Sequence, residues 1–148
     1  MYAGPAARAF DGVGAARNRQ RWNPRRVRAA YASGSLSLAA LEYLGTLVDL
    51  EGAPADLVSV RAEIDERAVE VLDPATLPGW DTTPPDISVR YGDGRARERR
   101  SVVLRVPSVM IPSEWNYVVN PDHPDFEAAV RVGEVRPFAF DERLLRQR

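Results

Sequence analysis

Apolar and polar residues alternate through the segment 58–64, which is the pattern of a strand with one buried face. Five further apolar segments have the length of short strands, and they cover residues 27–33, 69–72, 101–106, 115–120 and 132–140. Proline, glycine or asparagine residues punctuate the chain between them. The pattern predicts a small sheet domain built from short strands that are mostly antiparallel.

One segment has the periodicity of a helix. Ser35 or Ser37 can cap this helix, which is expected to continue to about Leu50, before Gly52 and Pro54 end it. Its leucine, valine and alanine residues cover a broad arc at 100° per residue, and only a narrow polar stripe remains. We therefore expect one main helix at about 35–50 that is mostly buried in the core.

The other segments are expected to be irregular. They comprise the first 25 residues, the four-proline connection 74–86 and the charged run 92–100, while Asp125–Val130 has the length of a short helical turn. Short strands with one main helix favour the α+β class. A chain of 148 residues fits one domain, so residues 1–148 are expected to form a single compact α+β unit.

The amino-acid composition argues against several classes of function. Hydrophobic residues make up 45% and charged residues 28% of the chain, which are globular values. Twenty basic against 21 acidic residues give a net charge of −1, so no overall positive field favours direct nucleic-acid binding. Every basic residue is arginine, which excludes a Schiff-base or phosphate-loop lysine.

The chain contains no cysteine and one histidine, His123. Disulfides, thiolate nucleophiles and multi-histidine metal centres are therefore excluded, and we expect no metal. No apolar run approaches the roughly 20 residues that span a bilayer, and the start of the chain lacks the features of a signal peptide. These features predict a cytoplasmic protein without a membrane segment.

The first candidate for chemistry is the segment Arg21-Trp-Asn-Pro24. A guanidinium group beside exposed backbone amides can hold a pyrophosphate, since arginine offers a fixed fork of donors. The alternative is a turn whose Trp22 fills the core. The preceding Gly12-Val-Gly14 lacks a strand before it and a helix after it, which excludes a dinucleotide-binding fingerprint.

Four further residues each have a functional and a purely structural interpretation. Glu42, within an apolar helix, is either poised for a reaction or solvated on the polar stripe. Tyr31 either stacks on a flat heterocycle or belongs to the core, and Ser108 either binds a ligand or ends a strand. His123 fits a turn better than catalysis, and the charged run 95–100 fits a solvated loop better than a phosphate-binding patch.

Taken together, the fragments resemble the RES-domain family, the toxin half of RES–Xre toxin–antitoxin modules, which includes ParT-like and MbcT-like proteins. The blocks occur in the family's order across nearly the whole chain, and they are Gly12-Val-Gly-Ala15, Arg21-Trp-Asn-Pro24, Tyr31-Ala-Ser33, Leu38-Ala-Ala-Leu-Glu42, Val106-Pro-Ser108, Asn116-Tyr117, Asn120-Pro-Asp-His-Pro124 and Pro137-Phe-Ala-Phe-Asp-Glu-Arg-Leu144.

This resemblance implies an α+β fold similar to ADP-ribosyltransferase toxins and NAD+ as the substrate. Family members either degrade NAD+ with water or phosphate or transfer ADP-ribose to a protein. By motif, Tyr2 and Arg21 would belong to the NAD+ pocket, with Arg21 near the phosphates. Tyr31 would pack on the nicotinamide side, Glu42 would be the key carboxylate and Ser108 the pocket serine. The partner implied is an Xre/ParS-type antitoxin in a hetero-oligomer, with a target protein as a further partner.

The chemistry fits these residue types. Cleavage of the nicotinamide–ribose bond develops oxocarbenium character, which a fixed carboxylate stabilises more in the transition state than in the ground state. Arginine can hold the diphosphate while an aromatic ring and a hydroxyl orient the leaving group. Neither a metal nor a thiol is needed.

The chain also departs from the family pattern. Met1 stands where the family usually has an arginine, Arg19 and Gln20 replace paired glycines, and an aromatic residue is replaced near Gly94-Arg95. The first departure motivates an alternative, a catalytically weakened RES-fold module that only binds its antitoxin. An arginine-rich, RNA-directed toxin is a further alternative, which a net charge of −1 disfavours.

Overall fold

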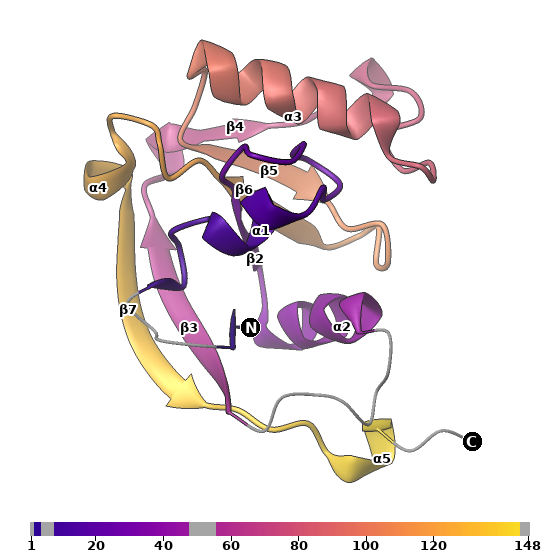
Figure 1. Ribbon diagram of the computed structural model, residues 1–148, viewed down its shortest axis with the longest axis vertical. Helices are drawn as coiled ribbons and strands as arrows, with labels where there is room; N and C mark the ends of the chain where they lie inside the picture. Colours follow the sequence, from indigo (N-terminus) through magenta and orange to yellow (C-terminus); the bar gives the residue numbers. More distant parts are fainter. Residues whose placement is uncertain (1, 4–7, 48–55, 146–148) are drawn as a thin grey trace.

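The computed structural model describes residues 2–3, 8–47 and 56–145, and of residues 2–3 only the backbone. Two sheets form the frame of the molecule, with strand orders β1-β3-β7 and β2-β6-β5-β4 (Figure 1). The strands are β1 Tyr2–Ala3, β2 Ala30–Ser33, β3 Leu57–Ile64, β4 Val69–Val71, β5 Val103–Pro107, β6 Trp115–Val119 and β7 Val130–Pro137. The α-helices are α1 Val13–Arg17, α2 Leu36–Thr46, α3 Asp86–Glu98, α4 Phe126–Ala129 and α5 Glu142–Leu145.

The α+β class and the mostly antiparallel sheets are confirmed. Every strand pair is antiparallel except β4 and β5, which run parallel. The six segments that the hydrophobic pattern assigned to strands correspond to β2 through β7, with ends that differ by a few residues. Asp125–Val130 contains the short helix α4, as expected.

The four-stranded sheet is covered on both faces, because successive side chains of a strand point to opposite sides. Val103 and Val119 belong to a core cluster that also holds residues of β3 and β7. Leu104 and Val118 belong to a second cluster with Trp22. Helix α3 lies above this second face (Figure 1).

Helix α2 begins where the sequence indicated. Ser35 caps it, since its hydroxyl oxygen accepts the Leu38 backbone N–H at 3.1 Å. The helix ends at Thr46 within the described residues, and the part of the expected helix beyond residue 47 lies outside them. The expected deep burial is wrong: only Leu38 is buried, while Leu36 is 51% exposed. The described chain covers one side of this apolar helix and leaves the other open.

Helix α3 corrects the expectation of a charged loop at 92–100 and of one main helix. Its 13 residues continue through Gly92 and Gly94 to Glu98. Gly92 serves a close approach of two backbones, since a Cβ atom there would lie 1.9 Å from the carbonyl oxygen of Trp22. Glycine at this position therefore marks helix packing and not a chain break.

The described part of the first 25 residues contains the short helix α1, which the sequence pattern did not predict. Gly12 precedes it with φ of +68°, as its glycine identity allowed. A Cβ atom at residue 12 would lie 2.8 Å from the backbone nitrogen of Ala29. This tight turn places the start of α1 against Arg28 and Ala29, the residues immediately before β2.

Within the described residues, no helix is long and apolar enough to cross a membrane.

Candidate functional site

Glu42 on α2 points at the four-stranded sheet and not into bulk solvent. Its Oε1 atom accepts the Ser108 hydroxyl at 2.7 Å and the Asn116 side-chain amide at 2.5 Å. Ser108, directly after β5, is fully buried. Its oxygen also accepts the backbone N–H groups of Met110 and Ile111 at 3.1 and 3.0 Å. The carboxylate is therefore fixed by two side chains, one directly after β5 and one near the start of the neighbouring strand β6.

Only one of the two carboxylate oxygens takes part in these contacts. The Oε2 atom of Glu42 has no hydrogen-bond partner in the part of the chain that the structure describes. Because Oε1 is held from two sides, the orientation of Oε2 is fixed as well. The arrangement presents one oriented anionic oxygen to whatever binds beside α2.

Asn116 and Ser33 complete this cluster, and neither was assigned a role from the sequence. Ser33 on β2 pairs with Asn116 on β6, and its hydroxyl donates to the Asn116 Oδ1 at 2.6 Å. This contact turns the amide nitrogen of Asn116 toward Glu42. The sequence indicates Asn116-Tyr117 only as part of a family motif, because the contact of Asn116 with Glu42 depends on the cross-strand register.

Tyr31 lies on the same face of the sheet as Ser33, two residues earlier on β2. Its hydroxyl donates to the Asn23 Oδ1 at 2.7 Å and accepts the Trp22 backbone N–H at 3.1 Å. Burial of the hydroxyl raises the pKa of Tyr31, against the opposing effects of the Trp22 N–H and the Arg21 charge. Although its hydroxyl is buried, Tyr31 is 38% exposed as a whole residue. Part of its aromatic ring therefore faces outward beside the Glu42 cluster.

Arg21 immediately precedes these hydroxyl contacts in the chain. Its Nη1 atom donates to the carbonyl oxygens of Trp80 and Thr82 at 3.1 and 3.0 Å. Trp22 is buried and the Asn23 side-chain amide donates to three backbone carbonyls, so this segment is a turn whose Trp22 fills the core. The phosphate-binding role of Arg21 stays a prediction. Arg21 thus lies at the loop that Tyr31 anchors.

The structure therefore places Arg21, Tyr31, Glu42 and Ser108 along one face of the four-stranded sheet. The loop of Arg21 bonds Tyr31, Tyr31 precedes Ser33 on the strand, and Ser33 leads through Asn116 to Glu42 and Ser108. The side chain of Tyr2 lies outside the described residues, and its backbone belongs to the other sheet, paired with Val58.

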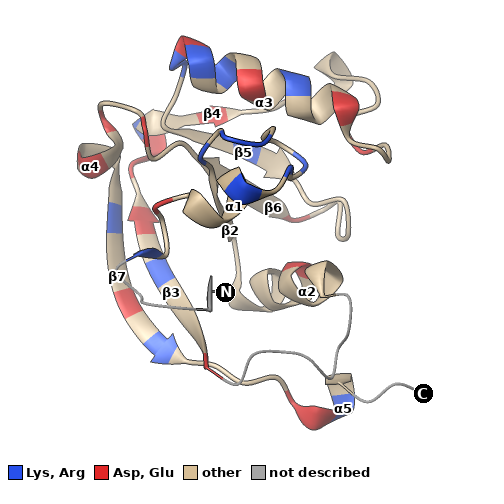
Figure 2. Cartoon of the chain, in the orientation of Figure 1, with Lys and Arg blue, Asp and Glu red and all other residues tan. Residues whose placement is uncertain are grey.

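Positive charge gathers beside this row of residues. The segment 17–28 carries six arginines and no acidic residue, and Figure 2 shows it as the blue stretch along α1 and the loop that follows. Arg19 and Arg28 are held by Asp86 and Asp122, whereas Arg25 is exposed. Such a segment attracts an anionic ligand locally although the whole chain is nearly neutral.

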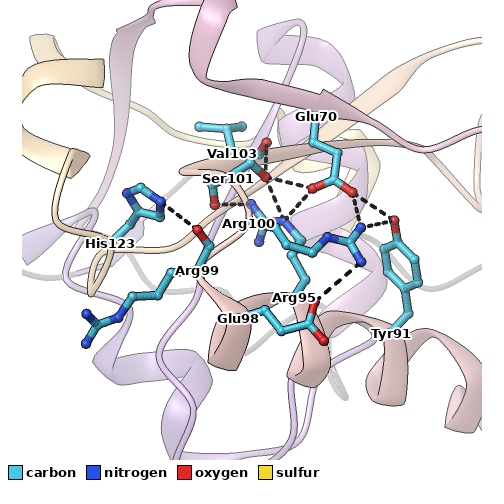
Figure 3. A network of polar contacts seen from close by, with 9 residues as sticks. All are labelled: Glu70, Tyr91, Arg95, Glu98, Arg99, Arg100, Ser101, Val103 and His123. Atoms are coloured by element: carbon cyan, nitrogen blue, oxygen red, sulfur yellow. Dashed lines mark hydrogen bonds and ion pairs between the residues drawn. The ribbon is translucent and has the colours of Figure 1, made fainter.

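A second polar cluster, shown in Figure 3, lies between β4 and the end of α3. Glu70 accepts the hydroxyls of Tyr91 and Ser101 at 3.0 Å each and forms an ion pair with Arg100. Arg95, with a side chain only 3% exposed, approaches the same carboxylate at 3.8 Å. Burial lowers the pKa of Arg95 to about 10. These groups satisfy one another, which indicates a structural role.

A hollow of about 790 Å³ lies next to this cluster and is lined by Arg67, Ser101 and His123, among others. Of the predicted site residues whose side chains the structure describes, none lines this hollow. His123 accepts the Asp125 backbone N–H at 3.1 Å and lies 3.0 Å from the carbonyl oxygen of Arg99. Histidine thus stabilises the turn after β6, in line with the structural interpretation of its sequence context.

Within the described residues, no group of three or more histidine, cysteine or acidic side chains could hold a metal ion.

Comparison with known proteins shows the family to which the chain belongs. A family model described as the RES domain matches residues 2–141. The chain belongs to the RES domain family. The chain is 36% identical over 145 residues to the Prs ADP-ribosylating toxin of Sphingobium sp. (strain YBL2), covering 93% of this chain and 88% of that protein.

Two further relatives are each named Toxin Res. The protein of Yersinia enterocolitica is 32% identical over 142 residues, covering 93% of this chain and 91% of its own length. The protein of Pseudomonas putida is 32% identical over 136 residues, with coverages of 91% and 92%. The chain thus aligns with these RES proteins over most of both lengths.

Proposed function

We propose that this protein is the toxin of a toxin–antitoxin pair, that its whole chain forms one RES domain, and that it cleaves NAD+ at the nicotinamide–ribose bond. The ADP-ribose is transferred to a protein side chain, with water or phosphate as alternative acceptors. The observation that carries the proposal is the oriented carboxylate of Glu42, on the same sheet face as Tyr31 and the loop of Arg21. The Sphingobium relative is named an ADP-ribosylating toxin, which supports this activity.

In the proposed reaction, the bond between C1′ of the ribose and the nicotinamide nitrogen breaks, and its electron pair leaves with nicotinamide. The acceptor then bonds to C1′ and releases its proton. The free Oε2 of Glu42 stabilises the positive charge that develops on the sugar, as carboxylates do in glycosidases. Tyr31 supplies an aromatic face for the nicotinamide side, and Arg21 binds the diphosphate.

Glu42→Gln provides the test, because glutamine has nearly the same shape without the charge. Purified protein is incubated with radiolabelled NAD+, with and without lysate protein, and nicotinamide release and labelled protein bands are measured. We expect the wild type to release nicotinamide and the variant to be slower by about 100-fold or more, the range for loss of one electrostatic stabiliser. Equal rates for the two proteins would refute the catalytic role of Glu42. No turnover by the wild type would refute the proposed enzymatic activity.

Calorimetry with NAD+, combined with the turnover assay, distinguishes the active enzyme from a catalytically weakened binding module. Binding without turnover would support the catalytically weakened module that the departure at Met1 suggested. Turnover would support the enzyme.

We also propose that an Xre/ParS-type antitoxin neutralises the protein in the cytoplasm. This partner is implied by the resemblance to RES–Xre modules, and the name Toxin Res of two relatives supports a toxin. Co-expression of a neighbouring Xre-type gene should restore growth and yield a co-purifying complex. Growth that stays arrested in the presence of a well-expressed Xre-type protein would contradict this partner.

A further inference from the structure

The hydrogen bonds of Arg21 divide its guanidinium group into two parts. Both N–H groups of Nη1 are directed to backbone carbonyls, those of Trp80 and Thr82. The Nε and Nη2 atoms have no protein partner within the described residues. These two atoms form the edge of the guanidinium fork that binds two oxygens of a phosphate side by side.

The carbonyl of Trp80 is itself held in place. The hydroxyl of Ser88, a fully buried residue on α3, donates to the same oxygen that Arg21 uses. The indole ring of Trp80 stacks on Trp22, with ring centres 6.3 Å apart and planes at 17°. The segment from Trp80 into α3 therefore contacts the arginine loop through both its backbone and its side chains.

Helix α3 contacts the loop directly as well. Gly92 lies against the Trp22 carbonyl so closely that a Cβ atom would be 1.9 Å from the oxygen. Tyr91 packs on the edge of the Trp22 ring with ring centres 6.3 Å apart. By contrast, a Cβ atom at Gly94, two residues further along the helix, would meet nothing within 4 Å.

We propose that residues 80–92 are a positioning element for Arg21. They hold the Nη1 side of the guanidinium so that its Nε–Nη2 edge is presented to the diphosphate of the substrate. Arg21 is the group that touches the substrate, whereas Ser88 and Gly92 act through it. This inference rests on the proposed function and adds a specific binding mode to it.

The two glycines of α3 provide a matched test. Gly92→Ala inserts a methyl group where the loop backbone lies, and Gly94→Ala inserts the same group into open space. We expect Gly92→Ala to raise KM for NAD+ and Kd for ADP-ribose by about tenfold or more, equivalent to one weakened charge-assisted hydrogen-bond pair. The kcat of Gly92→Ala should stay within about twofold of the wild type, since Glu42 is held by other elements. Gly94→Ala should behave as the wild type in all three measurements.

Ser88→Ala gives a second readout that adds no atoms and removes one donor from the Trp80 carbonyl. We expect it to raise KM and the Kd for ADP-ribose severalfold, again with little change in kcat. This variant decides the question if Gly92→Ala does not fold, as judged by its thermal melting curve. Wild-type KM and Kd in Ser88→Ala would overturn the inference.

The outcomes also separate this inference from the proposed function. If the wild type neither cleaves NAD+ nor binds ADP-ribose, the proposed function fails. If the wild type does both, and folded Gly92→Ala and Ser88→Ala match it, the positioning role of residues 80–92 fails while the function stands. A fall of kcat without a change in KM would also contradict the inference, because it would place the effect at the reacting bond.

Discussion

At the scale of single residues, the site depends on which oxygen of Glu42 is occupied. Asn116 and Ser108 both bond Oε1, and Ser33 sets the orientation of the Asn116 amide. The sequence predicted Glu42 and Ser108 through the family resemblance. It gave no reason to choose Asn116 or Ser33, because their meeting requires the register in which Ser33 faces Asn116 across β2 and β6.

Asn116→Asp tests this arrangement. The substitution replaces an amide donor with a second carboxylate at hydrogen-bond distance from Glu42, so the two groups repel and the orientation of Oε2 is lost. We expect kcat for nicotinamide release to fall at least about tenfold, and Asn116→Ala to fall less because it adds no charge. KM for NAD+ should change little in both, and a wild-type kcat in Asn116→Asp would exclude a positioning role.

Tyr31→Phe tests the anchor of the arginine loop. The substitution leaves the buried Asn23 Oδ1 and the Trp22 N–H without their partner, so we expect the free energy of unfolding to fall by about 1–3 kcal/mol at pH 7. Because folding raises the pKa of Tyr31 above 10.0, its contribution is complete below pH 10 and is lost as the pH rises through the folded-state value. The difference between the two proteins in urea unfolding should therefore shrink above pH 10. A constant difference across that range would contradict the buried hydroxyl.

At the scale of elements, the pattern of apolar residues predicted the strands and the start of α2, because strand alternation and the Ser35 cap are local signals. Helix α3 was not predicted, because glycine and charged residues in a short segment usually indicate a loop. In this segment they are explained instead by contacts with distant parts of the chain. Gly92 makes room for Trp22, and Arg95 is buried against Glu70. The exposure of Leu36 was missed because periodicity gives the apolar face of a helix and not what covers it.

Glu70→Gln tests how α3 is fastened to β4. Burial raises the pKa of Glu70, but hydrogen bonds from Arg100, Ser101 and Tyr91 outweigh it, so the net pKa is lowered (Figure 3). A carboxylate with a lowered pKa stabilises the fold above its unfolded value near 4.5 and loses that contribution as the pH falls through the folded value. We expect the variant to be less stable by about 1–3 kcal/mol at pH 7, since the buried Arg95 loses its counter-charge.

The comparison is made by urea unfolding of both proteins at pH 7 and near pH 3. The two proteins should differ clearly at pH 7 and converge at low pH. Glu134→Gln on β7 is the matched control, because that carboxylate forms its ion pair with the exposed Arg136 and contacts no buried charge among the described residues. Equal stability of the Glu70 variant and the wild type at pH 7 would show that the cluster does not hold the helix.

At the scale of the whole molecule, the net charge of −1 conceals an uneven distribution. The six arginines of residues 17–28 lie on the segment that carries Arg21, while the acidic residues are spread over other elements (Figure 2). Net charge alone disfavoured an RNA-directed toxin, but this local concentration requires a direct test. A dinucleotide and an RNA chain would both be attracted to it.

Charge reversal at Arg25 separates these two ligands. Arg25 is exposed and four residues from Arg21, and Arg61 on β3 is an exposed control in the other sheet. If the patch steers NAD+, Arg25→Glu should raise KM by about two- to fivefold at 20 mM salt and much less at 500 mM, because ions screen exposed charges beyond several ångströms. Arg61→Glu should leave KM unchanged.

The RNA alternative is tested by measuring the RNA affinity of the wild type at 50 and 200 mM salt. An RNA-binding protein would lose affinity steeply over this range, and we expect no such binding. Strong salt-dependent RNA affinity that Arg25→Glu abolishes, with KM for NAD+ unchanged at both salt concentrations, would instead assign the patch to RNA.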